Sequence, residues 1–387
     1  NGSTAYEPGS GITIQAYAGI CAGDNTQPNS EDYFHRISLN EILGFTTSGT
    51  GASCGTLTTT GNNAPTVTTA AAFTIPKSTP FALTATGSDP DGDTLTYLWE
   101  QFNAGATANA EGVLTDSDGP IFRSFIPTTS PTRIFPSLRY ILDNANVVPA
   151  TAALPGTTSP TTWMTGERLP GTARTMNFRV TARDNRAGGG GTNEASTVIT
   201  VSAAAGPFAV TAPNTAVTWA AGSSQTITWN VAATNAAPVN TANVEIALSL
   251  DGGYTFPVIL AASTPNDGTE TLTIPAGTPP TTQARIRVAA VGNIFFDISD
   301  SNFTITGTNT APTLTVTGSV TTRQGSPAAT AVVATVSDAQ DIAGSLTVAV
   351  SQVPPELNVT VNNVGGNVSM TATASCTLVT PTSSNKT

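Results

Sequence analysis

The sequence predicts a mainly β protein, with tandem β-sandwich modules behind a short helical N-terminal segment. Three observations predict this class. Val, Ile, Leu and Phe recur in short alternating runs between Thr, Asn, Gly and Pro, as in strands with one buried face. Charged residues make up only 10% of the 387 residues, less than half the ~25% of an ordinary soluble domain. Persuasive helical periodicity is confined to one stretch near the N-terminus.

Composition excludes several function classes. The net charge of −11 argues against a nucleic-acid partner and against anionic membrane surfaces. No apolar run reaches the ~18 residues that a membrane-spanning helix needs. The single histidine, His35, cannot build a zinc site of two or three imidazoles, so we expect no Zn²⁺ in this chain and a structural or surface role for His35. The sequence starts at Asn1 without a recognisable signal peptide, and we expect a piece of a longer secreted precursor.

The helical stretch lies in the first 60 residues. Asn29 or Ser30 can cap a helix over residues 30–43, and two acidic residues follow in its first turn. Residues 44–62 are rich in Gly, Thr and Ser, which indicates a linker.

A repeat indicates the module boundaries. Asn-Asn-Ala-Pro at 62–65 returns as Asn-Thr-Ala-Pro at 309–312, and each time an acidic turn follows one strand pair later. Proline fixes its own φ and holds the preceding residue extended, so this linker enters each module stiffly. We therefore predict four regions, with bounds at 1–60, 61–205, 206–307 and 308–387, the last of which is too short for a complete sandwich.

Period-2 alternation predicts the strands of the two central regions. Trp99 has the position of a sandwich-core tryptophan, and Asp251-Gly252 predicts a tight hairpin. An insertion between about residues 104 and 173 overlaps the stretch from Arg123 to Arg186, which holds most of the arginines. These arginines pair with carboxylates or form an anion or polysaccharide site. The expected strands cover residues 80–87, 95–100, 175–183, 196–202, 216–220, 224–231, 244–250, 270–274, 284–291 and 301–305.

The best chemical signal is an acidic turn in the second region. Asp89, Asp91 and Asp93 place three carboxylates at i, i+2 and i+4 around a glycine, where they can converge on one hard cation. Asp184 and Asn185 lie at the far end of the same region and can complete the shell. We predict a Ca²⁺ site from these five residues. The alternative is a solvated β-turn whose aspartates accept hydrogen bonds from backbone amides.

Two further predictions concern the repeat and the cysteines. Asp338 and Asp341 form a weaker second copy of the acidic turn. Cys21 and Cys54 flank the helical stretch, and a disulfide between them would contribute ~3–4 kcal/mol in an oxidising compartment. The alternative is two buried thiols. Cys376 then has no partner among the three cysteines of the chain.

Part of the sequence resembles a known family. Residues 11–21 (Gly-Ile-Thr-Ile-Gln-Ala-Tyr-Ala-Gly-Ile-Cys) and 27–35 resemble the end of the catalytic domain in secreted bacterial reprolysin-like zinc metallopeptidases. Residues 122–127, 174–179 and 295–300 resemble the Ig-like tail of the same family. The resemblance implies a remnant of the catalytic domain in residues 1–60, followed by Ig-like or cadherin-like modules of the kind that bind Ca²⁺.

The sequence departs from the family at two points. The His-Glu-x-x-His helix that carries the family's zinc ligands is absent. The methionine that the family places in a turn under the metal is replaced by Gln15.

The expected function is therefore non-catalytic. We expect an extracellular stalk, adhesion or substrate-docking region of a reprolysin-like secreted protein, with copies of itself or a cell-surface polymer as partners. Two alternatives stay open. One is a self-assembling filament or surface-layer subunit that uses incomplete modules for strand exchange. The other is part of an active zinc metallopeptidase whose catalytic helix lies outside this chain.

Overall fold

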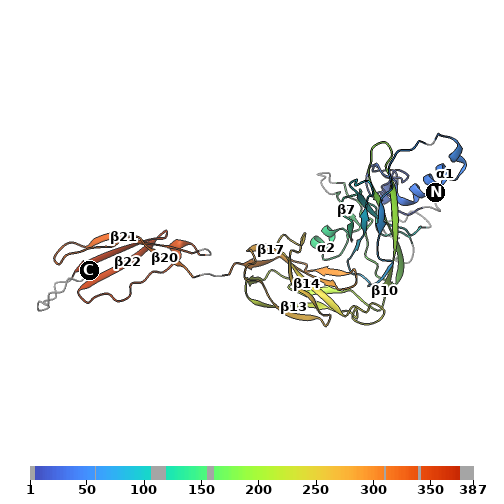
Figure 1. Cartoon of the computed structure of the whole chain (residues 1–387). Coiled ribbons are helices and arrows are strands. Elements are labelled where there is room, and N and C mark those ends of the chain that lie inside the picture. Colours follow the sequence, from blue (N-terminus) through green and yellow to red (C-terminus); the bar gives the residue numbers. More distant parts are fainter. Residues whose placement is uncertain are drawn as a thin grey trace. The chain divides into compact units, whose positions relative to one another are not determined.

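The computed structural model describes residues 5–56, 58–105, 119–154, 161–308, 311–338 and 341–374. The chain divides into two compact units, Asn1–Thr306 and Gly307–Thr387. Among the described residues, strands β1 to β23 dominate and two α-helices accompany them (Figure 1). The predicted class, mainly β with tandem sandwiches and a short helical N-terminal segment, is confirmed.

The N-terminal helix starts later than the sequence predicts. Helix α1 covers Arg36–Thr47, and His35 caps it through Nδ1, which accepts a hydrogen bond from the Ile37 amide at 3.2 Å. The predicted start at residue 30 is wrong because the side chain of Gln27 ties the preceding residues into a loop, donating to the Asn29 carbonyl at 2.7 Å. Short 3-10 turns η2 (Ala22–Asp24) and η3 (Thr50–Ser53) flank this segment.

The first sandwich contains a four-stranded sheet in the order β2-β10-β9-β5. Strands β2 and β10 run parallel, and the other pairs are antiparallel. Two antiparallel pairs, β1 with β4 and β3 with β6, supply further core residues. The bounds are β1 (Thr66–Thr68), β2 (Ala72–Pro76), β3 (Phe81–Thr84), β4 (Thr86–Ser88), β5 (Thr96–Gln101), β6 (Thr132–Phe135), β9 (Arg174–Arg183) and β10 (Thr192–Ser202).

The insertion carries regular structure that the sequence did not predict. Helix α2 (Leu138–Asn144) buries Tyr140, Ile141 and Leu142. It ends at Ala145, whose φ of 49° lies in the left-handed region. Its seven residues are too few to show helical periodicity. A short hairpin follows, formed by β7 (Thr151–Ala152) and β8 (Trp163–Met164).

The second sandwich consists of one three-stranded and one six-stranded sheet. The first has the order β11-β13-β16; the second has the order β12-β19-β17-β14-β15, with β18 paired to β17. Strands β14 and β15 form an antiparallel hairpin, but the predicted tight turn is wrong, because β14 ends at Ser249 and β15 begins only at Val258. In the longer loop between them, Asp251 Oδ1 accepts from the amides of Tyr254 and Thr255. The bounds are β11 (Ala209–Ala212), β12 (Thr218–Ala220), β13 (Ser224–Asn230), β14 (Asn243–Ser249), β15 (Val258–Pro265), β16 (Thr269–Thr273), β17 (Thr281–Ala290), β18 (Phe296–Ile298) and β19 (Phe303–Thr306).

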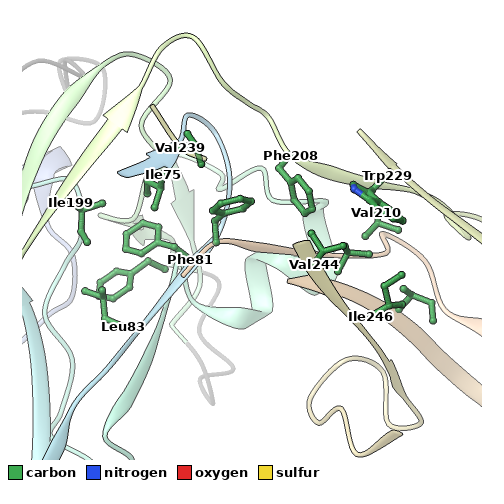
Figure 2. Packing of buried hydrophobic residues seen from close by; sticks show 14 of the residues in the cluster. Ile75, Phe81, Leu83, Ile199, Phe208, Val210, Trp229, Val239, Val244 and Ile246 are labelled. Carbon is green, nitrogen blue, oxygen red and sulfur yellow. The ribbon is translucent and has the colours of Figure 1, made fainter. Parts of the chain in front are cut away.

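One hydrophobic core runs through both sandwiches, from Val67 to Ile305 (Figure 2). Stacked and edge-on phenylalanine rings fill its first part: the ring of Phe135 lies 5.0 Å from that of Phe81 and 4.9 Å from that of Phe178. Trp99 is buried in the core as predicted and donates its indole N–H to a backbone carbonyl. The two sandwiches therefore form a single packed body.

Hydrogen bonds of the backbone and of the Asp297 side chain also join the two sandwiches, next to the shared core. The Ala82 amide donates to the Ile294 carbonyl at 3.0 Å, beside β18. The buried Asp297 accepts from the Val210 amide at 2.6 Å and from the Asn146 side chain at 2.8 Å. Burial raises the pKa of Asp297 to about 7. One carboxyl group thus links strands of the second sandwich to the insertion of the first.

The second unit is much thinner. In its described residues, 311–338 and 341–374, the strands form one antiparallel sheet in the order β20-β21-β23-β22. Its small core of Val and Ala centres on Val333 and Val336. On the edge strand β20, Leu314 is 53% exposed and Val316 74% exposed. The bounds are β20 (Thr313–Val316), β21 (Ala329–Ser337), β22 (Leu357–Val364) and β23 (Asn367–Ala374), with a 3-10 turn η5 (Ala343–Ser345).

Candidate functional site

The acidic turn lies between β4 and β5. Carboxylate oxygens of Asp89, Asp91 and Asp93 all lie within 4.8 Å of one another. Gly92 has a φ of 82°, which favours glycine, and its amide donates to the Asp89 carbonyl at 3.3 Å. The tight turn is what brings the three carboxylates together, and carboxylate oxygens are the type of ligand that Ca²⁺ takes in proteins.

Only one oxygen of the three carboxylates accepts hydrogen bonds from backbone amides of the turn itself. Asp89 Oδ1 accepts from the amides of Asp91 at 2.8 Å and Asp93 at 3.2 Å. The Oδ2 atoms of Asp89 and Asp93 are buried and have no hydrogen-bond partner. A buried carboxylate oxygen that accepts no hydrogen bond is costly. Asp93 Oδ2 has an ion-pair partner in Arg186 at 3.7 Å, whereas the structure gives Asp89 Oδ2 no such partner among the described residues.

Arg186 supplies positive charge at the same place. Its Nη1 lies 3.3 Å from Asp91 Oδ2 and 3.7 Å from Asp93 Oδ2. Asp91 also accepts from the backbone amide of Asn63 at 2.7 Å and from its side chain at 3.0 Å. These bonds from Asn63 hold the pKa of Asp91 below its usual range. Asp91 is therefore ionised at neutral pH with or without a cation.

The structure does not add Asp184 and Asn185 to the convergent carboxylates. Asp184 is buried and accepts from the Asn62 side chain at 2.7 Å and from the Gly191 amide at 2.8 Å. Burial acts to raise its pKa, but these hydrogen bonds outweigh burial and the pKa of Asp184 is lowered. Asn185 donates to Thr96 Oγ1 at 3.1 Å. The oxygens of Asp184 and the amide of Asn185 already have partners, so a cation at the turn depends on the three aspartates of residues 89–93.

The Asn-Asn-Ala-Pro linker has a role that the sequence did not show. Asn62 is bound by Asp184 and Asn63 by Asp91, so the linker is fastened to both acidic elements of the first sandwich. A signal was present in the repeat, because an asparagine stands three residues before the proline in both copies. In the second copy, the Asp341 amide donates to Asp338 Oδ1 at 3.0 Å.

The predicted disulfide is not formed, since Cys21 and Cys54 are both free. Each thiol faces a carbonyl of its own local turn: Cys21 Sγ that of Tyr17 at 3.6 Å, and Cys54 Sγ that of Thr50 at 3.9 Å. The alternative of two buried thiols is wrong too, because Cys54 is exposed. Cys376 lies outside the described residues.

A buried polar group that the sequence analysis missed joins α1 to β5. Glu100 is 1% exposed and accepts from the Arg36 amide at 2.9 Å and from Ser124 Oγ at 3.0 Å. His35 Nε2 lies 3.6 Å from Glu100 Oε1. Burial raises the pKa of Glu100 to about 7 and lowers the pKa of His35 to about 4. His35 is thus a neutral structural residue at neutral pH.

This group does not have the geometry of a serine hydrolase. Ser124 donates to Glu100 and not to His35, so the hydrogen bond between serine and histidine that a catalytic triad requires is missing. Ser124, His35 and Glu100 are all buried, which leaves no access for a substrate. The three residues fasten the N-terminal segment to the first sheet.

Arginines of the insertion are also used internally. Arg123 donates to the Thr26 carbonyl at 3.2 Å and to Gln27 Oε1 at 2.6 Å. Arg133 donates to the Trp99 carbonyl at 2.6 Å and pairs with Glu167 at 3.3 Å. These arginines hold the N-terminal segment, the insertion and the core together.

No family model matches the chain, and no curated protein matches it. Solved structures that resemble it are multidomain β-sandwich proteins. Sidekick-1 immunoglobulin domains 1–5 are 12% identical over 79% of this chain and 49% of that chain, with a TM-score of 0.17. The chicken CNTN1 FN1–FN3 domains are 10% identical over 62% of this chain and 66% of theirs, with a TM-score of 0.20. A chimeric titin Z1Z2 is 11% identical over 64% of this chain and 98% of its own, with a TM-score of 0.19.

These similarities concern sandwich folds of the Ig and fibronectin kind and carry no argument about function. The chain spans about half the length of the Sidekick-1 fragment and about two thirds of the CNTN1 fragment. Among the described residues, no helix is long and apolar enough to cross a membrane.

Proposed function

We propose that the chain is a non-catalytic, extracellular β-sandwich region of a reprolysin-like secreted protein, where it acts as a stiff stalk or docking segment. The observation that carries this proposal is the single hydrophobic core shared by the two sandwiches of the first unit. A shared core resists bending between modules, which a stalk requires. The family context rests on the resemblance of residues 11–21 and 27–35.

The acidic turn fits a stabilising cation. Ca²⁺ takes six to eight oxygen ligands and accepts carboxylates in irregular geometry. The Oδ2 atoms of Asp89 and Asp93, which accept no hydrogen bond, would hold it together with Asp91, and water or backbone carbonyls would supply the remaining ligands. When bound, the ion would neutralise the turn that fastens the linker at Asn63.

A protease assay tests the non-catalytic role. Purified chain is incubated with casein, with and without a zinc chelator. We expect no hydrolysis in either sample, because the described residues offer no set of imidazole ligands for zinc. Hydrolysis that the chelator blocks would overturn the proposal and favour the protease alternative.

A melting experiment tests the cation. After EDTA treatment, excess Ca²⁺ is expected to raise the melting temperature of the wild type. Asp93→Asn keeps the shape of the side chain but removes its charge, and it should abolish the rise. Asp267→Asn changes an exposed aspartate in a different turn and should leave the rise intact. No rise in the wild type would mean that residues 89–93 form only a hydrogen-bonded turn.

Self-assembly is the second candidate function. Strand β20 is a sheet edge, and its Leu314 and Val316 expose apolar side chains that another strand can cover. Analytical ultracentrifugation of the chain over a concentration series measures this. Assembly that Val316→Lys abolishes would support it, and a monodisperse monomer at all concentrations would remove it.

A further inference from the structure

A cavity of about 660 Å³ lies within the first unit, where the N-terminal segment faces the insertion. Ile12 and residues 27–31 form one wall, and residues from α2 and from the β7–β8 hairpin form the other. Its volume lies in the range of ~300–1,000 Å³ that is typical of small-ligand sites. Arg123, which lines the cavity, ties the N-terminal segment to the insertion.

The charged side chains that line the cavity already form hydrogen bonds or ion pairs within the chain. Both terminal nitrogens of Arg123 donate to the N-terminal segment. Arg139 donates to the hydroxyl of Tyr140 and to the Ala153 carbonyl. Glu167 accepts from Arg133 and from the Ser137 amide. Arg123 and Arg139 are matched in the cavity lining by Glu31 and Glu167, so the formal charges of the lining cancel and do not favour an anionic ligand.

Neutral polar groups remain available. Among the described residues, the structure gives no partner to the side chains of Asn29, Ser30 and Ser137 or to the indole N–H of Trp163, and all four residues line the cavity. Glu31 uses Oε1 to accept from Gln27, which leaves Oε2 as an acceptor. Amide, hydroxyl and carboxylate groups are suitable partners for ligand hydroxyls.

Aromatic surface lies beside these groups. Trp163 and Phe125 are half-buried at the cavity, and Tyr140 is buried beneath it. An aromatic ring presents a flat apolar face, and the indole adds a polar edge. A flat apolar platform bordered by hydrogen-bonding groups matches a pyranose ring, which has apolar C–H faces and hydroxyls at its rim.

We propose that this cavity binds one or two units of a neutral polysaccharide. Trp163 provides the stacking platform, and Asn29, Ser30 and Glu31 bind hydroxyls. The inference rests on the proposed docking function and names the class of polymer that is docked. A peptide strand fits less well, because β7 is two residues long and offers little edge for strand addition.

Calorimetry and tryptophan fluorescence on the whole chain test the proposal. The probes are neutral hexasaccharides of glucose, N-acetylglucosamine, mannose and xylose, each compared with an acidic galacturonate hexamer and an unstructured Gly/Ser peptide. We expect at least one neutral hexasaccharide to bind and change the fluorescence. Trp163→Ala should weaken that binding at least tenfold, and Trp163→Phe should retain part of it. Tyr254→Ala removes an aromatic ring that is 68% exposed outside the cavity and should change nothing.

Several results would overturn the inference. They are the absence of binding to every neutral hexasaccharide, binding of the acidic hexamer or the peptide alone, and binding that Trp163→Ala leaves unchanged while circular dichroism shows a folded variant. Each of these leaves the stalk proposal standing if the chain is inert toward casein. Chelator-sensitive casein hydrolysis would remove the stalk proposal whatever the saccharide result.

Discussion

The two units of the chain use strands of similar composition but differ in the side chains that form their hydrophobic cores. In the first unit, sheets pack on both sides of large rings, and Phe81, Phe135 and Phe178 are fully buried. In the described part of the second unit, one sheet rests on Val and Ala side chains, while Leu314 and Val316 stay half-exposed or more. Alternating apolar residues suffice to form strands, whereas a closed core also needs a second layer and large side chains.

The location of the tryptophans makes this difference measurable. All four tryptophans, Trp99, Trp163, Trp219 and Trp229, belong to the first unit. Tryptophan fluorescence therefore reports on the first unit alone, and far-ultraviolet circular dichroism reports on both.

The largest effect is expected from Phe178→Ala. The ring of Phe178 contacts those of Phe81, Phe122 and Phe135, so its loss leaves a cavity in the shared core. We expect about 3–5 kcal/mol of destabilisation in urea unfolding followed by fluorescence. Phe178→Leu should cost less, because it fills part of the space. A loss under about 1 kcal/mol would contradict the role of the rings, as would a normal fluorescence midpoint.

Glu100→Gln should change how stability depends on pH. The folded pKa of Glu100, about 7, lies above its ordinary value of 4.5. The neutral carboxyl is thus favoured in the fold, and its stabilisation is complete below pH 4.5 and lost as pH rises through 7. The amide of Gln does not ionise, so the variant should gain up to about 3 kcal/mol relative to the wild type across this window.

The control for this prediction is His35. Its folded pKa of about 4 lies below the ordinary 6.5, so its contribution is lost in the opposite direction, as pH falls from 6.5 toward 4. Both proteins keep His35, which lies 3.6 Å from Glu100, so the two contributions are told apart by the direction in which each changes with pH. Parallel curves of melting temperature from pH 5 to pH 8 would contradict the raised pKa.

A smaller effect, confined to the second unit, is expected from Val368→Ala. Val368 is buried in the small core of that unit, and truncating it removes apolar contacts worth about 2 kcal/mol. The loss should appear in circular dichroism and leave the fluorescence transition unchanged. A shift of the fluorescence midpoint would mean that the two units do not unfold independently.

The smallest effect is expected from Asn146→Gly. Asn146 has a φ of 67°, which glycine adopts without strain, so the change mainly removes the hydrogen bond to Asp297. We expect a loss of about 1 kcal/mol with one fluorescence transition. Two separate transitions would show that the sandwiches of the first unit are less tightly joined than their shared core indicates.

Local patterns in the sequence were sufficient for the strands but not for the contacts between distant segments. Met176, Phe178 and Val180 alternate with polar residues, and β9 buries all three. The start of α1 was misplaced because Asn29 and Ser30 satisfy the capping rule locally, while the side chain of Gln27 holds them in a loop.

The buried group around Glu100 could not be predicted from local sequence patterns either. All four of the residues from Leu98 to Gln101 are buried, so alternation fails there, and the partners Arg36 and Ser124 come from distant segments. Of the candidate site, the acidic run at 89–93 was visible in the sequence. The separate hydrogen-bonding role of Asp184 depends on which backbone amides the fold brings to it.

The parallel pairing of β2 with β10 has a mechanical consequence. Strand β2 follows β1 near the start of the first sandwich, and β10 is the last strand of that sandwich. Five residue pairs, from Ala72 to Pro76 and from Val198 to Ser202, hold β2 and β10 side by side. Tension on the chain would pull these strands in opposite directions along their common axis. The backbone hydrogen bonds between β2 and β10 would then be loaded together in shear and would not break one after another.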